Sequence, residues 1–416
     1  MSTLYKGYLK TGNVTGSVQL HPKKKRRGQP VMRPDTVLDT LQAAGFEAWY
    51  AGGCVRDTLL GRPVHDWDVT TSALPEQVIA LFPKTVPTGL KHGTVTVLAQ
   101  NQSVEVTTYR ADGSYHDGRH PDGVRFVRSL REDTARRDFT VNAMVMAQDG
   151  RIVDYHGGRA DLAAKVLRCV GEPEQRFRED VLRMLRACRF AAQLGFSIEP
   201  ETWAALLRCA PLCDRLSRER ITAEVTRTLL SPRPQWVSAM IETGLLRSCG
   251  LSGRYDLTWL SGLPATESVR WAGLGILLPA LDYRAFRLPS NLVKLCQSAR
   301  AHWSPGRGRL AWKRLIAAEG TELAALLASM EQTGAVSEIL TSGECVSLKA
   351  LAVSGRDFPE LRGAAVGQML HALLEHVLAS PQDNRREALL ALAKTLEVSR
   401  LSKNEEMQFR DIAPFT

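Results

Sequence analysis

The pattern of hydrophobic and polar positions changes once along this chain, near residue 172. Before that point, short alternating runs predict strands, separated by segments with helical periodicity. The expected strands are 46–51, 66–70, 95–98, 104–108 and one around 152–154. After residue 172 strand signals vanish, and helical periodicity continues nearly to the end. The pattern therefore predicts an α/β domain followed by an all-α region.

Helices are expected between the strands, and one long helix should open the all-α region. The short ones are Thr36–Ala44, 54–60 and Leu74–Leu81, and the long one is Glu174–Leu194. Residues 110–128 are polar and rich in glycine, and they have no apolar periodicity. Loops this long without apolar periodicity are often functional or mobile, so we expect an irregular loop here.

Composition narrows the class of protein and of partner. The 416 residues carry a formal net charge of +10, which favours a polyanionic partner. No apolar run approaches 18 residues, so no membrane span is expected. The eight cysteines are scattered without a C-x-x-C pair, which is typical of reduced thiols in the cytoplasm and of neither a zinc site nor a disulfide framework.

The stretch from Gly52 to Thr70 carries the strongest chemical signal. Asp66 and Asp68 are two positions apart, so on a strand both carboxylates point to one face, where they suit Mg²⁺. Gly52-Gly53 permits close approach of the backbone to a phosphate, and Arg56 offers a fork of donors to a triphosphate. An Asp-x-Asp pair alone is usually a solvated strand end. The combination within one short stretch predicts two-metal nucleotidyl transfer.

Two later segments add candidate residues. Glu105 lies in the middle of a predicted strand, and we interpret it as a third carboxylate of the site; the alternative is an exposed side chain on the solvent face. In the run Arg136-Arg137-Asp138, two arginines beside an aspartate suit a triphosphate or a ribose, with Asn142 near the sugar hydroxyls.

The long helix predicted at Glu174–Leu194 has the residues to recognise a base. Asp180 and Arg183 are three positions apart and should share a helix face, which Arg186 and Arg189 extend as a basic ridge. An acceptor beside a donor matches the amino group and ring nitrogen of cytosine and adenine, and mismatches uracil and guanine. Arg186 and Arg189 suit a triphosphate or primer backbone. The alternative for Asp-x-x-Arg is an ordinary surface ion pair.

Six segments occur in an order and at a spacing that are highly specific. They are GGCVRDTLLGRPVHDWDVTTSALPE, VEVTTYR, RRDFTVNAM, DYHGGRADL, REDVLRMLRACRFAAQLGF and SRERITAE. With them the chain resembles the bacterial class II CCA-adding tRNA nucleotidyltransferases, within the tRNA nucleotidyltransferase and poly(A) polymerase family. The similarity is strong over residues 34–230 and weaker beyond.

The resemblance implies an elongated, multidomain fold. A head at 34–172 would contain a mixed sheet of about five strands with helices. An all-α neck, body and tail would follow at 173–235, 236–310 and 311–416. The composition of residues 1–33, rich in Lys, Gly and Thr, separately predicts a disordered basic extension, with an RNA-binding arm or a targeting signal as the alternative. Trp67, between the two aspartates, departs from the small or aliphatic residue expected there; on a strand it points to the opposite face, so we expect it to pack in the core.

The resemblance also implies an activity: addition of CCA to tRNA 3′ ends from CTP and ATP, with Mg²⁺ as cofactor. Asp66 and Asp68 would be the metal ligands, with Glu105 as a further catalytic group. The nucleotide would be bound by Gly53, Arg56, Arg137, Asp180, Arg183, Arg186 and Arg189. Glu179 would position its neighbours, and the tail would hold the tRNA. No membrane association and no obligatory protein partner are expected.

Relatives with narrower activities share these segments. Enzymes that add only CC typically have a shortened loop before the Arg-Arg-Asp run. Here that loop is full length and keeps Asp112, Gly113, Tyr115, Arg119 and Pro121, which indicates competence for A addition. An enzyme that adds only A, a poly(A) polymerase, and a non-catalytic tRNA-binding protein remain as alternatives.

Overall fold

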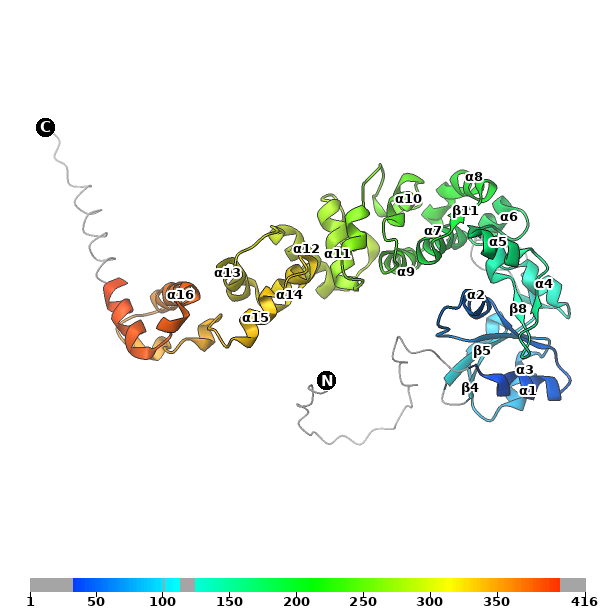
Figure 1. Cartoon of the computed structure of the whole chain (residues 1–416), viewed down its shortest axis with the longest axis horizontal. Helices are drawn as coiled ribbons and strands as arrows, with labels where there is room; N and C mark the ends of the chain where they lie inside the picture. Colours follow the sequence, from blue (N-terminus) through cyan, green and yellow to red (C-terminus); the bar gives the residue numbers. More distant parts are fainter. Residues whose placement is uncertain (1–32, 100–101, 113–123, 397–416) are drawn as a thin grey trace.

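The computed structural model describes residues 33–99, 102–112 and 124–396. The described chain is elongated, with an α/β head at one end and a curved succession of helices leading away from it (Figure 1). This arrangement confirms the predicted fold class. The prediction of a disordered extension at 1–33 lies, except for Arg33, outside the described residues, as do Gly113, Tyr115, Arg119 and Pro121.

The head is built on one mixed sheet that contains seven strands within the described residues. Its order is β3-β4-β5-β2-β1-β8-β9, in which β2 and β5 are parallel neighbours and the other pairs are antiparallel. The strands are β1 (Ala48–Ala51), β2 (Asp68–Thr71), β3 (Thr85–Gly89), β4 (Thr94–Ala99), β5 (Gln102–Thr108), β8 (Val145–Met146) and β9 (Ile152–Val153).

The sheet has more strands than the expected five because β3 and β8 lack the usual strand signal. β3 contains Pro87 and an irregular register, and β8 has only two residues. Both add to the sheet by tertiary pairing, which a single strand's apolar pattern does not reveal.

Five helices of the described head accompany the sheet: α1 (Asp35–Ala43), α2 (Gly53–Leu59), α3 (Pro75–Leu81), α4 (Leu130–Ala135) and α5 (Gly158–Ala164). Trp67 is buried, with its ring centroid 4.8 Å from that of Tyr50, so the prediction that it packs in the core is confirmed. The ends of the predicted irregular loop pair instead as a second small sheet, β6 (Arg110–Asp112) with β7 (Val124–Phe126).

The prediction of one long helix at Glu174–Leu194 is wrong, because the segment forms two helices. α6 (Pro173–Glu179) ends at Asp180, whose backbone is extended with φ −135° and ψ 103°, and α7 (Leu182–Leu194) begins two residues later. The Asp180 carboxylate accepts a hydrogen bond from the Leu182 backbone N–H at 3.1 Å. A short acidic side chain that bonds to nearby backbone N–H groups favours such a break over a continuous helix.

Strand pairing also extends beyond residue 172, contrary to the prediction. β10 (Val166–Leu167) pairs in parallel with β11 (Ser197–Ile198), which follows α7. These two-residue strands tie the end of α7 to the segment that leaves the head.

The remaining region is helical, as predicted. It contains α8 (Pro200–Cys209), α9 (Arg218–Leu229), α10 (Trp236–Glu242), α11 (Glu267–Leu277), α12 (Ser290–His302), α13 (Arg309–Glu319), α14 (Thr321–Met330), α15 (Ala335–Thr341) and α16 (Ala364–Ala379). One apolar core includes buried residues from Val37 to Ile339, and a separate core runs from Cys345 to Ala393. All eight cysteines are buried and free. In the described ranges, no helix has the length and apolar character that crossing a membrane requires.

Candidate active site

Carboxylates gather where β2 and β5 run side by side. Asp68 is the first residue of β2, and its register partner across the parallel pair is Glu105 on β5. Register partners on neighbouring strands project to the same face, so these two carboxylates are adjacent. Asp68 is half-buried and Glu105 is exposed. The strand pairing therefore brings together two carboxylates that are 37 positions apart in sequence.

Asp66 lies just before β2 and is exposed, although the sequence predicted a strand from residue 66. The intervening Trp67 turns into the core. In the described part of the chain, no three or more His, Cys, Asp or Glu side chains are grouped so that they could hold a metal ion. An ion on Asp66 and Asp68 would therefore complete its shell with water and substrate oxygens, which is how Mg²⁺ is usually bound.

The glycine pair predicted to approach a phosphate lies at the start of α2. Gly52 has φ +77°, a region that favours glycine, and a Cβ there would be 3.2 Å from Arg137 Nη1. The lack of a side chain at Gly52 thus allows Arg137 to lie against the beginning of α2. Gly53 is the first residue of that helix.

Arg56, on α2, is buried, and its guanidinium already has partners. It donates to Asp57 through Nε and Nη2, each at 3.0 Å, and through Nη1 to Asn142 Oδ1 at 2.6 Å. Its Cζ also lies 5.3 Å from the centroid of Phe190 on α7. Arg56 therefore connects the head to the first long helix beyond it.

Asp138 continues this connection. Its Oδ1 accepts from Asn142 Nδ2 at 3.1 Å, and its Oδ2 accepts from Arg186 Nε at 2.9 Å and Nη2 at 2.5 Å. Burial alone would raise the pKa of Asp138, but the Arg186 guanidinium holds it far below the usual range. A continuous chain of hydrogen bonds thus links Arg56, Asn142, Asp138 and Arg186.

Sequence reasoning missed Asp133, which is fully buried beneath the site. Its carboxylate accepts from Arg136 at 2.9 Å and from Arg137 at 3.2 Å. It also accepts from Thr70 Oγ1 at 3.1 Å, on the strand that carries Asp68. Burial raises the pKa of Asp133, and the charges of Arg137 and Arg136 lower it by more, so it is depressed overall. An aspartate three and four positions before two consecutive arginines was the available signal.

The three arginines of the predicted basic ridge are each paired with a carboxylate in the structure. Arg183 is buried and donates to Glu179 Oε2 at 2.9 Å and to the Arg136 carbonyl at 2.8 Å. Arg189 is buried and donates from Nε to Glu224 Oε2 at 2.5 Å.

Asp180 is separated from the helix that carries Arg183. Besides the bond from the Leu182 backbone N–H, its carboxylate accepts from Arg220 Nη2 at 3.2 Å. The two residues of the predicted reading pair therefore lie three positions apart but on either side of a helix break, and each is oriented by its own partner.

This architecture has close counterparts. A CCA-adding enzyme of Enterococcus faecalis is 36% identical over 402 residues, which cover 90% of this chain and 96% of the relative. The chain belongs to the CCA-adding enzyme family. A second such enzyme, from Geobacillus stearothermophilus, is 44% identical over 272 residues, 62% of this chain and 66% of the relative.

Solved structures agree with this family membership. The crystal structure of the Bacillus stearothermophilus CCA-adding enzyme in complex with CTP is 34% identical and has a TM-score of 0.77; the match covers 89% of this chain and 100% of that one. A Thermotoga maritima CCA-adding enzyme complexed with tRNA shares the fold at 18% identity, with a TM-score of 0.61 over 87% of this chain and 94% of that one.

Two family models match separate parts of this member of the CCA-adding enzyme family. Residues 48–168 match the Poly A polymerase head domain, and 195–249 match the "Probable RNA and SrmB- binding site of polymerase A". The carboxylates and Arg137 lie in the first segment. Asp180, Arg183, Arg186 and Arg189 lie between the two.

Proposed function

We propose that this protein adds CCA to the 3′ end of tRNA without a template, using CTP and ATP and releasing pyrophosphate. The observation that carries the proposal is the similarity to a CCA-adding enzyme across 90% of the chain, with the aspartate pair at the head of β2. The net charge of +10 suits an RNA substrate. A reaction on tRNA, together with eight free thiols, favours the cytoplasm.

Asp66 and Asp68 are proposed to hold Mg²⁺. The fit follows from the donor set: carboxylate oxygens at a strand edge, one exposed and one half-buried, are hard ligands that leave room for phosphate oxygens. When bound, Mg²⁺ lowers the pKa of the attacking hydroxyl and neutralises charge on the departing pyrophosphate. Glu105, as the register partner of Asp68, is proposed to orient the tRNA 3′-hydroxyl or accept its proton.

The nucleotide's phosphates are proposed to lie against the start of α2. Arg137 faces Gly52 there, so its guanidinium and the backbone at Gly53 are available to one ligand. Arg56 and Arg186 support this position through the hydrogen-bond chain that includes Asp138. Arg189 lies on α7 with Arg186 and forms an ion pair with Glu224. It is proposed to contribute to nucleotide binding from that position.

Asp180 and Arg183 are proposed to recognise the base edge. Cytosine and adenine each present an amino donor beside a ring-nitrogen acceptor, which an aspartate acceptor and an arginine donor complement. Glu179 holds Arg183, and Arg220 holds Asp180, so both side chains are oriented before a base arrives. Orientation by fixed partners reduces the ordering cost of recognition.

Replacing Arg183 with alanine is expected to relax this selectivity. A paired recognition contact is worth about 1–3 kcal/mol, so discrimination against UTP relative to CTP should fall by roughly 10- to 100-fold. The measurement is kcat/KM for each of the four nucleoside triphosphates. Arg178→Ala is the matched control, because Arg178 pairs with Glu174 on the exposed side of α6. Unchanged selectivity would remove Arg183 from the reading role.

The domain roles follow the same proposal. The head at 34–172 would carry catalysis, and the neck at 173–235 would read the base. The body at 236–310 would connect them to a tail at 311–416 that holds the tRNA. The separate apolar core from Cys345 to Ala393 supports an independent unit at the far end of the chain.

The activity is tested with three tRNA transcripts that end before CCA, after CC, and after CCA. Each receives Mg²⁺ with CTP, ATP or both. Extension of the first by CCA, followed by termination, is the expected result, and removal of Mg²⁺ by a chelator should stop it. Extension of only the CC-ended tRNA, by a single A, would make this an A-adding enzyme; unlimited addition of A would make it a poly(A) polymerase.

A further inference from the structure

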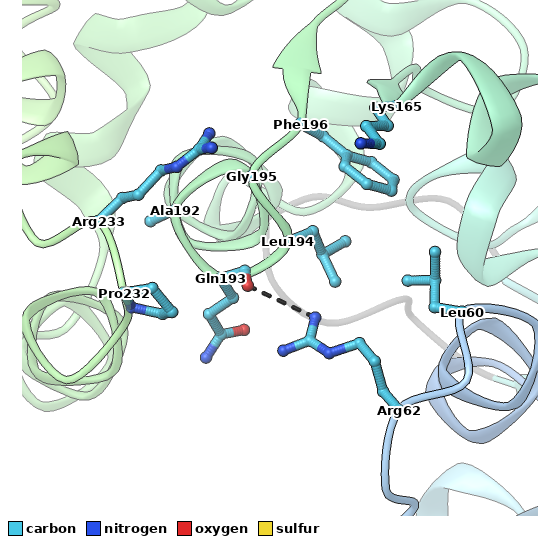
Figure 2. Close-up of a pocket in the computed structure, with 10 residues that line it drawn as sticks. All are labelled: Leu60, Arg62, Lys165, Ala192, Gln193, Leu194, Gly195, Phe196, Pro232 and Arg233. Carbon is cyan, nitrogen blue, oxygen red and sulfur yellow. Dashed lines mark hydrogen bonds between the residues drawn. The ribbon is translucent and has the colours of Figure 1, made fainter.

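A cleft of about 350 Å³ lies at the C-terminal end of α7, on the opposite end of that helix from Arg183 (Figure 2). Three separate segments surround this end of the helix. Leu60 and Arg62 come from the segment after α2, Lys165 precedes β10, and Arg233 lies between α9 and α10. The cleft therefore forms where the head meets the helices that follow it.

The cleft is lined by cations without a matching anion. Arg62, Lys165 and Arg233 are all exposed, and none of the residues that line the cleft is acidic. Within the described chain, these three cations make no ion pair. The neighbouring α6 and α7 differ in this respect, since their arginines are each paired with a carboxylate: Arg176, Arg178, Arg183, Arg186 and Arg189.

The guanidiniums of Arg62 and Arg233 lie beside the end of α7. Gly195 ends α7 with φ +76°, and a Cβ there would lie 3.0 Å from Arg233 Cζ, so the missing side chain leaves room for Arg233. Arg62 Nη1 donates a hydrogen bond to the carbonyl oxygen of Gln193 at 3.4 Å, drawn as the dashed line in Figure 2. Both side chains thus lie beside the same helix end while remaining accessible.

The cleft lies within reach of the carboxylates proposed to carry out the reaction. Arg62 is four residues before Asp66, so their Cα atoms are at most about 14 Å apart. Successive phosphates of one strand in a duplex advance by ~3.4 Å, so a few nucleotides span that distance. A strand that reaches the carboxylates with its 3′ end can therefore pass the cleft.

We propose that Arg62, Lys165 and Arg233 bind backbone phosphates of the RNA strand that carries the 3′ end, close to its reacting hydroxyl. Guanidinium forks bind phosphate through two parallel hydrogen bonds, and the lysine adds a point charge. Such contacts set the register of a nucleic acid without reading its sequence. This inference rests on the proposed function, because it takes the substrate to be RNA.

The test uses the full chain and a tRNA transcript that ends before CCA. The variants Arg62→Gln, Lys165→Gln and Arg233→Gln, and the Lys165→Gln/Arg233→Gln double variant, are compared by tRNA binding over a range of salt concentrations. We expect the double variant to lose about tenfold or more in tRNA affinity. The slope of log K for tRNA binding against log salt concentration should be less steep by ~0.7–0.9 for each phosphate contact removed. The KM for CTP should stay within about twofold.

Arg254→Gln is the control for the loss of one positive charge, because Arg254 is 87% exposed and lies elsewhere on the chain. Equal tRNA affinity and salt dependence in the double variant and this control would overturn the proposal. A raised KM for CTP with unchanged tRNA affinity would also overturn it, by assigning the cleft to the nucleotide's phosphates. CCA incorporation by the wild-type protein is measured separately. If tRNA binding depends on the cleft but no CCA is incorporated, the proposed function is refuted and the phosphate-binding proposal is retained.

Discussion

Alanine in place of Asp68 is expected to abolish nucleotide transfer while tRNA binding persists. Asp68 heads β2 beside Glu105, so its loss removes a proposed metal ligand. A metal ion contributes several kcal/mol to the transition state, and we expect incorporation to fall by roughly a thousandfold or more. The measurement combines CTP incorporation with tRNA binding at matched salt.

The control for Asp68 is Asp39→Ala, which removes an exposed carboxylate from α1 in the same domain. It should leave incorporation within about twofold of wild type. Thermal unfolding of both variants checks that the head remains folded. Incorporation by Asp68→Ala at the rate of the control would refute the metal assignment.

Replacing Asp133 with alanine is expected to destabilise the head and to weaken nucleotide binding together. Arg136 and Arg137 would lose the buried carboxylate between them, and Thr70 would lose its acceptor. Removing one partner of a buried ion pair typically costs about 3–5 kcal/mol. Because Asp133 orients Arg137 and the strand of Asp68, the KM for CTP should also rise.

Two further variants separate positioning from folding at Asp133. Asp133→Asn keeps an acceptor and should recover part of the stability but not the charge on which Arg137 depends. Glu132→Ala is the neighbouring control, since Glu132 is exposed. Its ion pair with Arg125, at 3.6 Å, is a surface pair of the kind that contributes little to stability. Urea unfolding and steady-state kinetics, at a temperature where all variants are folded, give both readouts. A stable Asp133→Ala protein with an unchanged KM for CTP would contradict the positioning role.

Local spacing predicted those parts of the site that depend on one segment. Because Asp66 and Asp68 are two positions apart, the side chain of Trp67 between them was predicted to point to the opposite face, and Trp67 is buried in the core. The same period in the strand of Glu105 allowed it to be recognised as an out-of-place charge. Its adjacency to Asp68 was then decided by the parallel pairing of β2 and β5.

The helix break at Asp180 shows where periodicity was insufficient. The apolar pattern of α6 and α7 continues through the break, because both helices pack on the same core. The backbone conformation at Asp180 depends instead on which local hydrogen bond its carboxylate makes. A pattern of apolar positions contains no information about that competition.

The sequence by itself determined the order of those strands and helices that have a local apolar pattern, the overall change from mixed α/β to mostly helical structure, and the candidate acidic and basic residues of the proposed site. Only the tertiary structure decided which charges are paired. Arg186 and Asp138 are 48 positions apart, and Arg189 and Glu224 are 35 apart. An arginine's sequence context is the same whether it is exposed or buried against a distant carboxylate. Burial and pairing are therefore properties of the packed chain, since the free energy of each charge depends on neighbours that only folding brings together.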